Sequence, residues 1–313
     1  MFRSSFVTAM TMATVAAVAV ALSACGQFSP PYLKPLTPQT QARLAEKGMT
    51  EEAPVLIRIF KAESELEVWK QKDNGRFYLF KTYPICSYSG GLGPKIEQGD
   101  RQAPEGFYSV SLDGMNPRSK YYLSFDVGFP NAYDRAHGRT GSNIMVHGDC
   151  TSAGCYAMTD AVVEEIFTLA RVALQNGQES IQIQAYPFRM TAANMTAHKD
   201  DKWIDFWKNL KEGYDYFEIS HLPPKVAVCE KRYLINASFT SGNVQPDPSG
   251  ACPAYQRLPI PRAPAMQEAS TKPAKKLDSA SLTKPLGSVM GLRFGPSKPG
   301  YTAFTLGPAT PGR

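Results

Sequence analysis

The sequence predicts a mixed α+β fold that is rich in strands and carries a few packed helices. Short runs of β-branched and aromatic residues, bounded by Gly, Pro and Asn, fill the first half of the chain. A sustained helical spacing of apolar residues begins only at Thr159. The 313 residues are 43% hydrophobic and 20% charged, which excludes full-length disorder, a collagen-like chain and a polytopic membrane protein. This length allows one large domain or two smaller ones.

Residues 1–24 have the parts of a secretory signal peptide. One basic residue precedes an apolar run that is too short for a confident membrane span, and the segment closes on small residues. The ending Leu22-Ser23-Ala24-Cys25 resembles a bacterial lipobox, which makes Cys25 the expected lipidation site. The alternative is a plain signal peptide with an incidental cysteine. Because Gly26 does not resemble the acidic residue associated with inner-membrane retention, we expect a periplasmic lipoprotein anchored in the outer membrane.

The mature chain is expected to start with a tether over residues 25–54, which contains five prolines. The first strand is expected over residues 55–60, a run of Val, Leu, Ile and Phe with one Arg. Strands over residues 66–69 and 77–83 follow. The Asn74-Gly75 pair between them is the strongest short hairpin signal, so these two strands should pair.

The remaining elements follow from the same two periodicities. More strands are expected over residues 106–110, 121–127 and 143–146. An amphipathic helix should begin with Thr159 or Asp160 as its N-cap and end before Gly177, packed on the sheet. Beyond it we expect a strand over 181–186, a helix over 202–210 and a last strand or strand pair over 225–235.

The net charge of +6 belongs to the C-terminal end of the chain. Residues 256–313 are Pro-rich with little periodicity and contain nine Lys and Arg against two Asp and Glu, so this tail carries about +7 and the rest about −1. We expect the tail to be mostly disordered and to contact anionic envelope polymers or lipid headgroups. No nucleic-acid partner is expected.

His147 and Cys155 are the candidate catalytic residues. A strand delivers His147 to its end, Gly148 permits a tight turn, and Cys155 lies just before the expected helix. A thiol reacts as thiolate, and both a neighbouring imidazolium and a helix N-terminus lower its pKa. The spacing predicts His147 as base and Cys155 as nucleophile, and the amides of Gly154 and Cys155 are the candidate oxyanion hole.

Two other readings of Cys155 compete with this one. In an exported protein Cys155 could be half of a structural disulfide. Alternatively, His147, Cys150 and Cys155 could ligate a metal, although no CxxC pair supports zinc.

The stretch resembles the L,D-transpeptidase catalytic domain, the YkuD-like family. The family signature is an upstream His-Gly followed by Ser/Thr-His-Gly-Cys, and the matching parts here are His147-Gly148 and Ser152-Ala153-Gly154-Cys155. Ala153 and the short loop depart from the larger family and fit its YafK-type branch. Flanking runs also resemble this branch, over residues 89–95, 99–108, 128–134 and 206–214.

The resemblance implies an L,D-transpeptidase-like sandwich over residues 55–240 and cysteine acyl transfer on peptidoglycan stem peptides. Cys155 and His147 would form and resolve a thioester, Gly148 and Ser152 would support the loop, and no cofactor or metal is expected. The acyl acceptor would be another stem or a Lys on an envelope lipoprotein or outer-membrane protein. If water is the acceptor, the chain is a hydrolase that releases peptidoglycan-linked lipoprotein. A noncatalytic envelope tether is the alternative from a different class.

Three basic residues upstream of the motif are candidate ligands for substrate carboxylates: Arg135, His137 and Arg139. The competing reading is a solvated loop.

The remaining cysteines of the mature chain allow three pairings. They are Cys86, Cys150, Cys229 and Cys252. We favour Cys229 with Cys252, because both lie near the C-terminal end of the expected domain. A regulatory bond between Cys150 and Cys155 is a further alternative.

Overall fold

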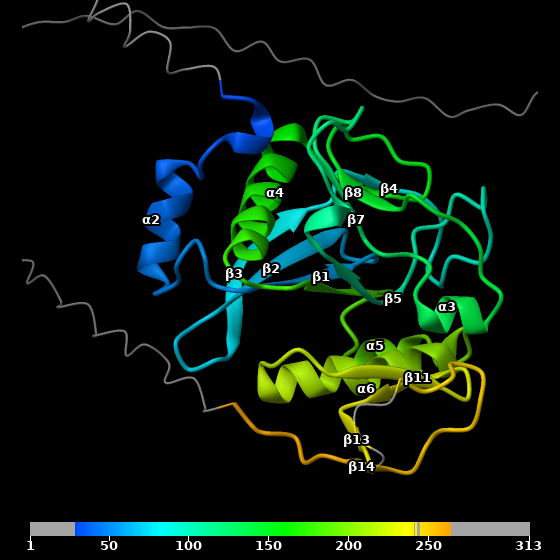
Figure 1. Cartoon of the computed structure of the whole chain (residues 1–313). Helices are drawn as coiled ribbons and strands as arrows, with labels where there is room; N and C mark the ends of the chain where they lie inside the picture. Colours follow the sequence, from blue (N-terminus) through cyan, green and yellow to red (C-terminus); the bar gives the residue numbers. More distant parts are fainter. Residues whose placement is uncertain (1–28, 241, 243–244, 264–313) are drawn as a thin grey trace, which may run out of the picture. The chain divides into compact units, whose positions relative to one another are not determined.

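A computed structural model describes residues 29–240, 242 and 245–263 (Figure 1). The predicted signal peptide, the lipidation site Cys25 and residues 264–313 of the predicted tail lie outside the described residues. Two five-stranded sheets and a few helices make a mixed α+β fold, which confirms the predicted class. None of the helices in the described ranges has the length and apolar character of a membrane span.

The first sheet, here called the β1 sheet, has the strand order β3-β2-β1-β10-β5. Its strands are β1 (Val55–Phe60), β2 (Glu65–Gln71), β3 (Phe77–Pro84), β5 (Gly106–Val110) and β10 (Ile181–Tyr186). The β2–β3 hairpin forms as Asn74-Gly75 predicts, and β1 runs parallel to β10. All six residues of β1 are buried, so both faces of this sheet are covered.

The second sheet, here called the β8 sheet, carries the predicted site. Its order is β4-β9-β8-β7-β6, with β4 (Ser87–Tyr88), β6 (Met115–Asn116), β7 (Ser124–Asp126), β8 (Met145–His147) and β9 (Tyr156–Ala157). β7 and β8 start later than predicted. Tyr122 and Asn143 have φ values of 67° and 57°, a left-handed conformation that an extended strand does not allow.

Helix α4 (Asp160–Gln175) joins the two sheets into one core. The side chain of its N-cap Thr159 accepts a hydrogen bond from the Val162 amide, as the sequence predicts. Its apolar face packs with residues from both sheets, among them Ile57 of β1 and Val146 of β8. In Figure 1, α4 and helix α6 lie on opposite sides of the β1 sheet.

Helix α6 (Ile204–Ser220) covers the other face of the β1 sheet, together with α3 (Ala132–Ala136) and α5 (Ala192–Ala197). It is ten residues longer at its C-terminal end than the predicted helix over 202–210. The polar run Lys211-Glu212-Gly213 interrupts the apolar spacing there, so the sequence pattern did not indicate that the helix continues. Gly213 is needed for packing, because a Cβ at this position would lie 2.4 Å from Cζ of Phe107.

The predicted tether over residues 25–54 is wrong for its described part. It forms the 3-10 helix η2 (Pro31–Leu33) and helix α2 (Pro38–Glu46), and Leu36, Leu44 and Met49 are buried in the main core. Proline fits the first turn of a helix, where no amide partner is required. The prolines that indicated a tether therefore include two that start a helix, Pro31 and Pro38.

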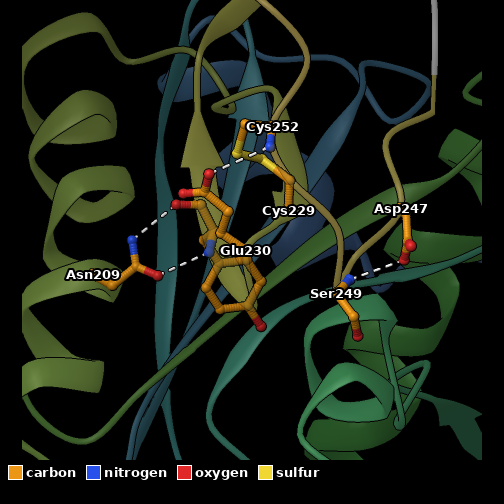
Figure 2. The surroundings of a disulfide bond; sticks show 7 residues. Asn209, Cys229, Glu230, Asp247, Ser249 and Cys252 are labelled. Atoms are coloured by element: carbon orange, nitrogen blue, oxygen red, sulfur yellow. Dashed lines mark hydrogen bonds between the residues drawn. A yellow bond between two sulfur atoms is a disulfide. The ribbon is translucent and has the colours of Figure 1, made fainter.

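The C-terminal part of the described chain is a pair of hairpins tied by a disulfide. They are β11 (Val226–Cys229) with β12 (Arg232–Ile235), and β13 (Ala237–Phe239) with β14 (Tyr255–Arg257). The Cys229–Cys252 bond confirms the favoured pairing (Figure 2). Residues 256–263 of the predicted tail are not detached, because β14 pairs with β13 and the Ala263 amide donates to the Ile219 carbonyl at 2.8 Å.

Candidate active site

The two predicted catalytic residues lie at two neighbouring parallel strands: His147 ends β8, and Cys155 directly precedes β9. Val146 of β8 pairs with Tyr156 of β9, and His147 pairs with Ala157. Val146 and Tyr156 point into the core. Because side chains alternate along a strand, His147 and Cys155, which directly follow and precede those two residues, lie on the opposite face of the β8 sheet. The fold thus places thiol and imidazole on one face.

Cys155 is the free cysteine among the described residues. Its Sγ accepts a hydrogen bond from the Met145 amide at 3.4 Å and lies 3.7 Å from the Asn143 carbonyl oxygen. Burial raises the pKa of the thiol, and the Asp126 carboxylate adds to this rise, while the Met145 amide and Lys95 oppose it. Cys155 is therefore a neutral thiol in the resting protein.

This direction contradicts the expectation that His147 and the helix start would lower the pKa of the thiol. In the first turn of α4 the Val162 amide donates to the Thr159 side chain, and the amide that donates to the sulfur is that of Met145 in β8. The imidazole carries no charge that could stabilise a thiolate, since burial also lowers the pKa of His147.

His147 is held in one tautomer. Its Nδ1 lies 2.6 Å from the carbonyl oxygen of Gly148, and a carbonyl can only accept, so Nδ1 carries the hydrogen and Nε2 keeps the lone pair. The residue is 3% exposed, and the Tyr121 ring lies 4.7 Å from the imidazole ring between centroids. A neutral His147 with a free Nε2 is suited to act as a general base toward a neutral thiol.

A disulfide ties the loop between these residues to the edge of the β8 sheet. Cys150 is bonded to Cys86, which directly precedes β4. Asp149 and Cys150 have φ values of 68° and 48°, two consecutive left-handed residues. The loop is also held by the Cys150 amide, which donates to the Met158 carbonyl, and by the Asp149 amide, which donates to Asp160 Oδ1.

The Cys86–Cys150 bond removes two alternatives. Cys150 has no thiol with which to form the suggested regulatory bond to Cys155. For the same reason it is not a metal ligand together with His147, since a disulfide sulfur is not a thiolate. In the described part of the chain, no three His, Cys, Asp or Glu side chains converge as a metal site would require.

Ser152 and Gly154 shape the turn that presents Cys155. The Ser152 hydroxyl donates to the Cys155 carbonyl oxygen at 2.7 Å and accepts from the Gly154 amide at 3.3 Å. Gly154 has φ 120°, a conformation that L side chains rarely adopt. Its amide is engaged with Ser152 here, so it would need to leave that hydroxyl before it could bind an oxyanion.

The three basic candidates for substrate binding are used in the fold itself. Arg139 is buried and paired with Asp134 Oδ1 at 2.8 Å. His137 stacks on Tyr133, and its Nδ1 lies 2.9 Å from the Tyr133 carbonyl oxygen. Arg135 donates to the Pro130 carbonyl oxygen. These contacts stabilise α3 and its flanks, and they leave Arg139 unavailable to a dissolved carboxylate.

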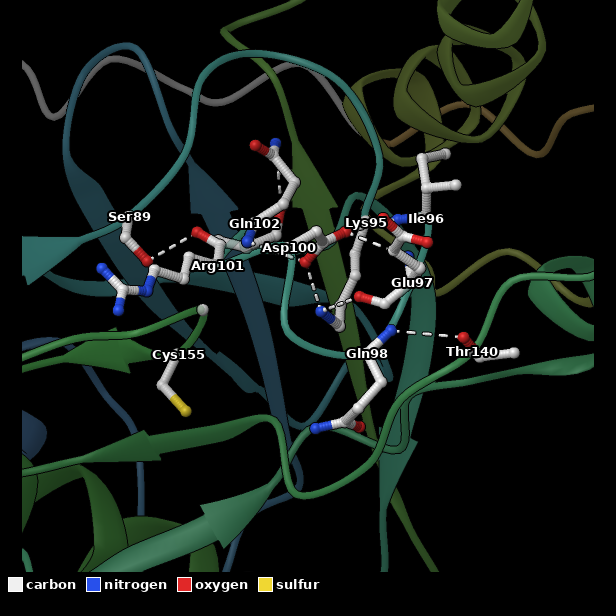
Figure 3. Close-up of polar contacts among 12 residues, drawn as sticks. Ser89, Lys95, Ile96, Glu97, Gln98, Asp100, Arg101, Gln102, Thr140 and Cys155 are labelled. Carbon is white, nitrogen blue, oxygen red and sulfur yellow. Dashed lines mark hydrogen bonds and ion pairs between the residues drawn. The ribbon is translucent and has the colours of Figure 1, made fainter.

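The loop over residues 95–102 is a part of the site that the sequence reasoning missed (Figure 3). Asp100 organises it: one oxygen accepts from the Gln102 amide and from Lys95 Nζ, and the other accepts from the amides of Ile96 and Glu97. The loop faces the nucleophile turn, because a Cβ at Gly154 would lie 3.6 Å from the Gln102 carbonyl oxygen. Gly99-Asp100, a typical turn pair, was the available signal.

A fully buried ion pair anchors the chain on both sides of this loop. Lys61 Nζ lies 2.9 Å from Glu105 Oε1 and also donates to the carbonyls of Gly93 and Ala103. The second Glu105 oxygen accepts from the indole of Trp207 on α6. Every oxygen of the carboxylate is thus satisfied, which a buried charge requires.

Comparison with known proteins shows which family the chain resembles. The model of the family "L,D-transpeptidase catalytic domain" matches residues 54–180. "Putative L,D-transpeptidase YafK" of Escherichia coli (strain K12) is 51% identical over 194 residues, which are 62% of this chain and 78% of that protein. The protein of the same name from Escherichia coli O157:H7 matches to the same extent.

Solved structures give weaker matches. The helical cell shape determining protein Pgp2 from Campylobacter jejuni is 20% identical with a TM-score of 0.36, covering 58% of this chain and 68% of that one. Bdellovibrio bacteriovorus Bd1075 is 20% identical with a TM-score of 0.31, covering 53% and 62%. The identity and coverage of the Escherichia coli relatives, together with the family match, show that this chain belongs to the L,D-transpeptidase catalytic domain family.

Proposed function

We propose that this chain is a cysteine acyltransferase that acts on peptidoglycan stem peptides through a thioester at Cys155. Membership of the L,D-transpeptidase family supports a peptidoglycan-modifying enzyme. The observation that carries the finer proposal is the placement of a free thiol and a neutral imidazole on one face of the β8 sheet. The His147 tautomer leaves Nε2 free to take the thiol proton.

The chemistry runs in two steps with one residue as base and acid. His147 Nε2 takes the proton of Cys155, and the thiolate attacks the carbonyl carbon that joins the diamino acid to the terminal residue. The carbon–nitrogen bond breaks, and the imidazolium returns the proton to the leaving amine. An acceptor amine then attacks the thioester, loses a proton to His147 and restores the thiol as the carbon–sulfur bond breaks.

The nature of the acceptor is tested with the pure protein. Tetrapeptide stems are incubated alone, with a second stem and with lipoprotein-bearing sacculi, and the products are separated by mass. Crosslinked or lipoprotein-linked products support transfer, whereas free tripeptide or released lipoprotein indicates that water is the acceptor. The noncatalytic tether predicts identical muropeptides in strains carrying the wild type and Cys155→Ala, and a difference between these strains removes it.

We further propose that the chain is exported, acylated at Cys25 and placed in the periplasm at the outer membrane, with its basic tail against anionic envelope polymers or lipid headgroups. The support is the sequence alone: residues 1–24, the ending Leu22-Ser23-Ala24-Cys25 and the charge of residues 256–313. Mass spectrometry of the mature N-terminus tests the anchor, and an unmodified Cys25 contradicts it. Deletion of residues 264–313 should weaken binding to sacculi or anionic vesicles, and unchanged binding contradicts the role of the tail.

A further inference from the structure

Arg101 presents an unpaired guanidinium beside the nucleophile turn. Its side chain has no hydrogen-bond acceptor and no carboxylate partner among the described residues, and the residue is exposed. Its backbone is nevertheless next to the site, because a Cβ at Gly154 would lie 3.8 Å from the carbonyl carbon of Arg101. In the view of Figure 3, Arg101 leaves the loop on the side where Cys155 lies.

The backbone that carries Arg101 is fixed on both sides. The preceding residue, Asp100, accepts a hydrogen bond from the Gln102 amide at 3.0 Å. The Ser89 hydroxyl donates to the Arg101 carbonyl oxygen at 2.7 Å. The Gln102 side chain bonds to the backbone of Gly91 and Gly93.

Arg101 itself has φ 53°, the left-handed conformation that non-glycine residues rarely adopt. Such conformations persist where the surrounding structure enforces them, and they cluster at ligand-binding positions. The direction in which the Arg101 side chain leaves the backbone is therefore set by the fold.

Two other cations of this region are already neutralised. Lys95 is buried and paired with Asp100, and Arg139 is buried and paired with Asp134. A substrate carboxylate that approached Cys155 along the 95–102 loop would meet the guanidinium of Arg101, for which the described residues supply no partner. The planar fork of Arg can bind a carboxylate with two parallel hydrogen bonds.

We propose that Arg101 is a specificity-determining residue that binds a carboxylate of the acyl donor. This rests on the proposed function. Two carboxylates of a stem peptide could accept the two hydrogen bonds of the guanidinium. One is the carboxylate of the leaving terminal residue, and the other is the free carboxylate on the side chain of the diamino acid.

The test crosses three donors with four proteins. The donors are a tetrapeptide stem as the free acid, the same stem amidated at the leaving residue, and the same stem amidated on the diamino acid. The proteins are the wild type, Arg101→Ala, Arg101→Lys and the matched control Arg232→Ala. The guanidinium of Arg232 is exposed on β12, and its ion pair with Glu212 is long, at 3.8 Å. Initial rates give KM and kcat separately for each combination.

We expect Arg101→Ala to raise KM for the free-acid donor about 10- to 100-fold, the range for a charged hydrogen bond, with little change in kcat. Amidation of the recognised carboxylate should raise KM of the wild type similarly, and Arg101→Ala should then cause no further rise. Arg101→Lys should recover part of the loss, because it restores the charge without the fork. Arg232→Ala should behave as the wild type.

Two results would overturn the proposal: unchanged KM in Arg101→Ala, or an equal rise for all three donors, which indicates a structural effect. Failure of the proposed function is distinguished by binding without turnover. In the Cys155→Ala background, calorimetry compares the affinity of the free-acid stem with and without Arg101→Ala. Arg101-dependent binding in this background, together with no turnover of stems by the wild type, would retain the subsite and reject the transferase.

Discussion

Removing the Cys86–Cys150 disulfide should impair catalysis far more than removing the Cys229–Cys252 disulfide. The perturbations are the double substitutions Cys86→Ser/Cys150→Ser and Cys229→Ser/Cys252→Ser. The first bond holds the loop between His147 and Cys155, whereas the second ties the C-terminal hairpins.

The two bonds should stabilise the fold by similar amounts. Their sequence separations are 64 and 23 residues, for which loop-closure entropy gives about 4 and about 3 kcal/mol. Urea unfolding at 25 °C measures both, in the Cys155→Ala background so that the free thiol cannot exchange with either disulfide. The second double substitution is thus a control for stability loss alone.

Their effects on activity should differ. Without the Cys86–Cys150 bond, the consecutive left-handed residues Asp149 and Cys150 lose their tie to the β8 sheet, and the turn relaxes. A displacement of reacting groups by about 1 Å costs on the order of 100-fold in rate. We expect kcat/KM to fall on that order in Cys86→Ser/Cys150→Ser and to change less than about threefold in the control.

The assay is turnover of the tetrapeptide stem, measured where circular dichroism shows both variants to be folded. Equal losses of kcat/KM in the two variants would show that activity falls only because stability falls. Full activity in Cys86→Ser/Cys150→Ser would show that the loop holds its geometry without the disulfide.

The remaining predictions concern buried charges, packing and pH. Glu105→Gln leaves the Lys61 ammonium without its counter-charge in the core and should cost about 3–5 kcal/mol in urea unfolding. Asp205→Asn, in the exposed pair with Lys208, should cost far less, and equal costs would contradict this. Burial lowers the pKa of Lys70 to about 8 from 10.5, so the unfolded chain binds more protons between these pH values and stability should rise with pH there, by up to about 3 kcal/mol. Lys70→Met should lack this rise, so a difference in unfolding free energy that stays constant from pH 7 to 9.5 would refute the shift. Gly213→Ala should cost about 1–3 kcal/mol through its clash with Phe107, and Phe107→Leu in the same chain should recover part of it; a neutral Gly213→Ala would refute the clash. Since the pKa of His147 is lowered and that of Cys155 is raised, alkylation of Cys155 by iodoacetamide should rise with a midpoint above the ordinary thiol pKa; a midpoint near pH 6 would indicate an ion pair instead.

The elements that could be predicted are those whose signals are local. β1, the β2–β3 hairpin and the capped start of α4 each depend on residues that are adjacent in sequence. The two-residue strands β4 and β9 could not be found, because their pairing partners come from elsewhere in the chain. The second half of α6 could not be predicted either. A glycine such as Gly213 disfavours a helix by its propensity, but here it is required by a close contact with Phe107.

In the site, too, the residues with local signals could be predicted and those brought in from distant positions could not. His147 and Cys155 stand in one short motif, so the chemistry of their side chains could be assigned from sequence. The Cys86 partner of Cys150 and the Tyr121 ring beside His147 come from 64 and 26 positions away, and no periodicity predicts them. The pKa directions were missed for a physical reason: burial outweighs neighbouring charges at both His147 and Cys155, and burial is a property of the assembled fold.

The most direct measurement is the mass of the intact protein mixed rapidly with a tetrapeptide stem and quenched in acid, which preserves thioesters. The account predicts an adduct equal to the stem minus its terminal residue, located on the peptide that contains Cys155. It should be absent from Cys155→Ala and should form much more slowly in His147→Ala, since the thiol then lacks its base. An adduct on another residue, or stem turnover by Cys155→Ala, would contradict the assignment of Cys155 as the nucleophile.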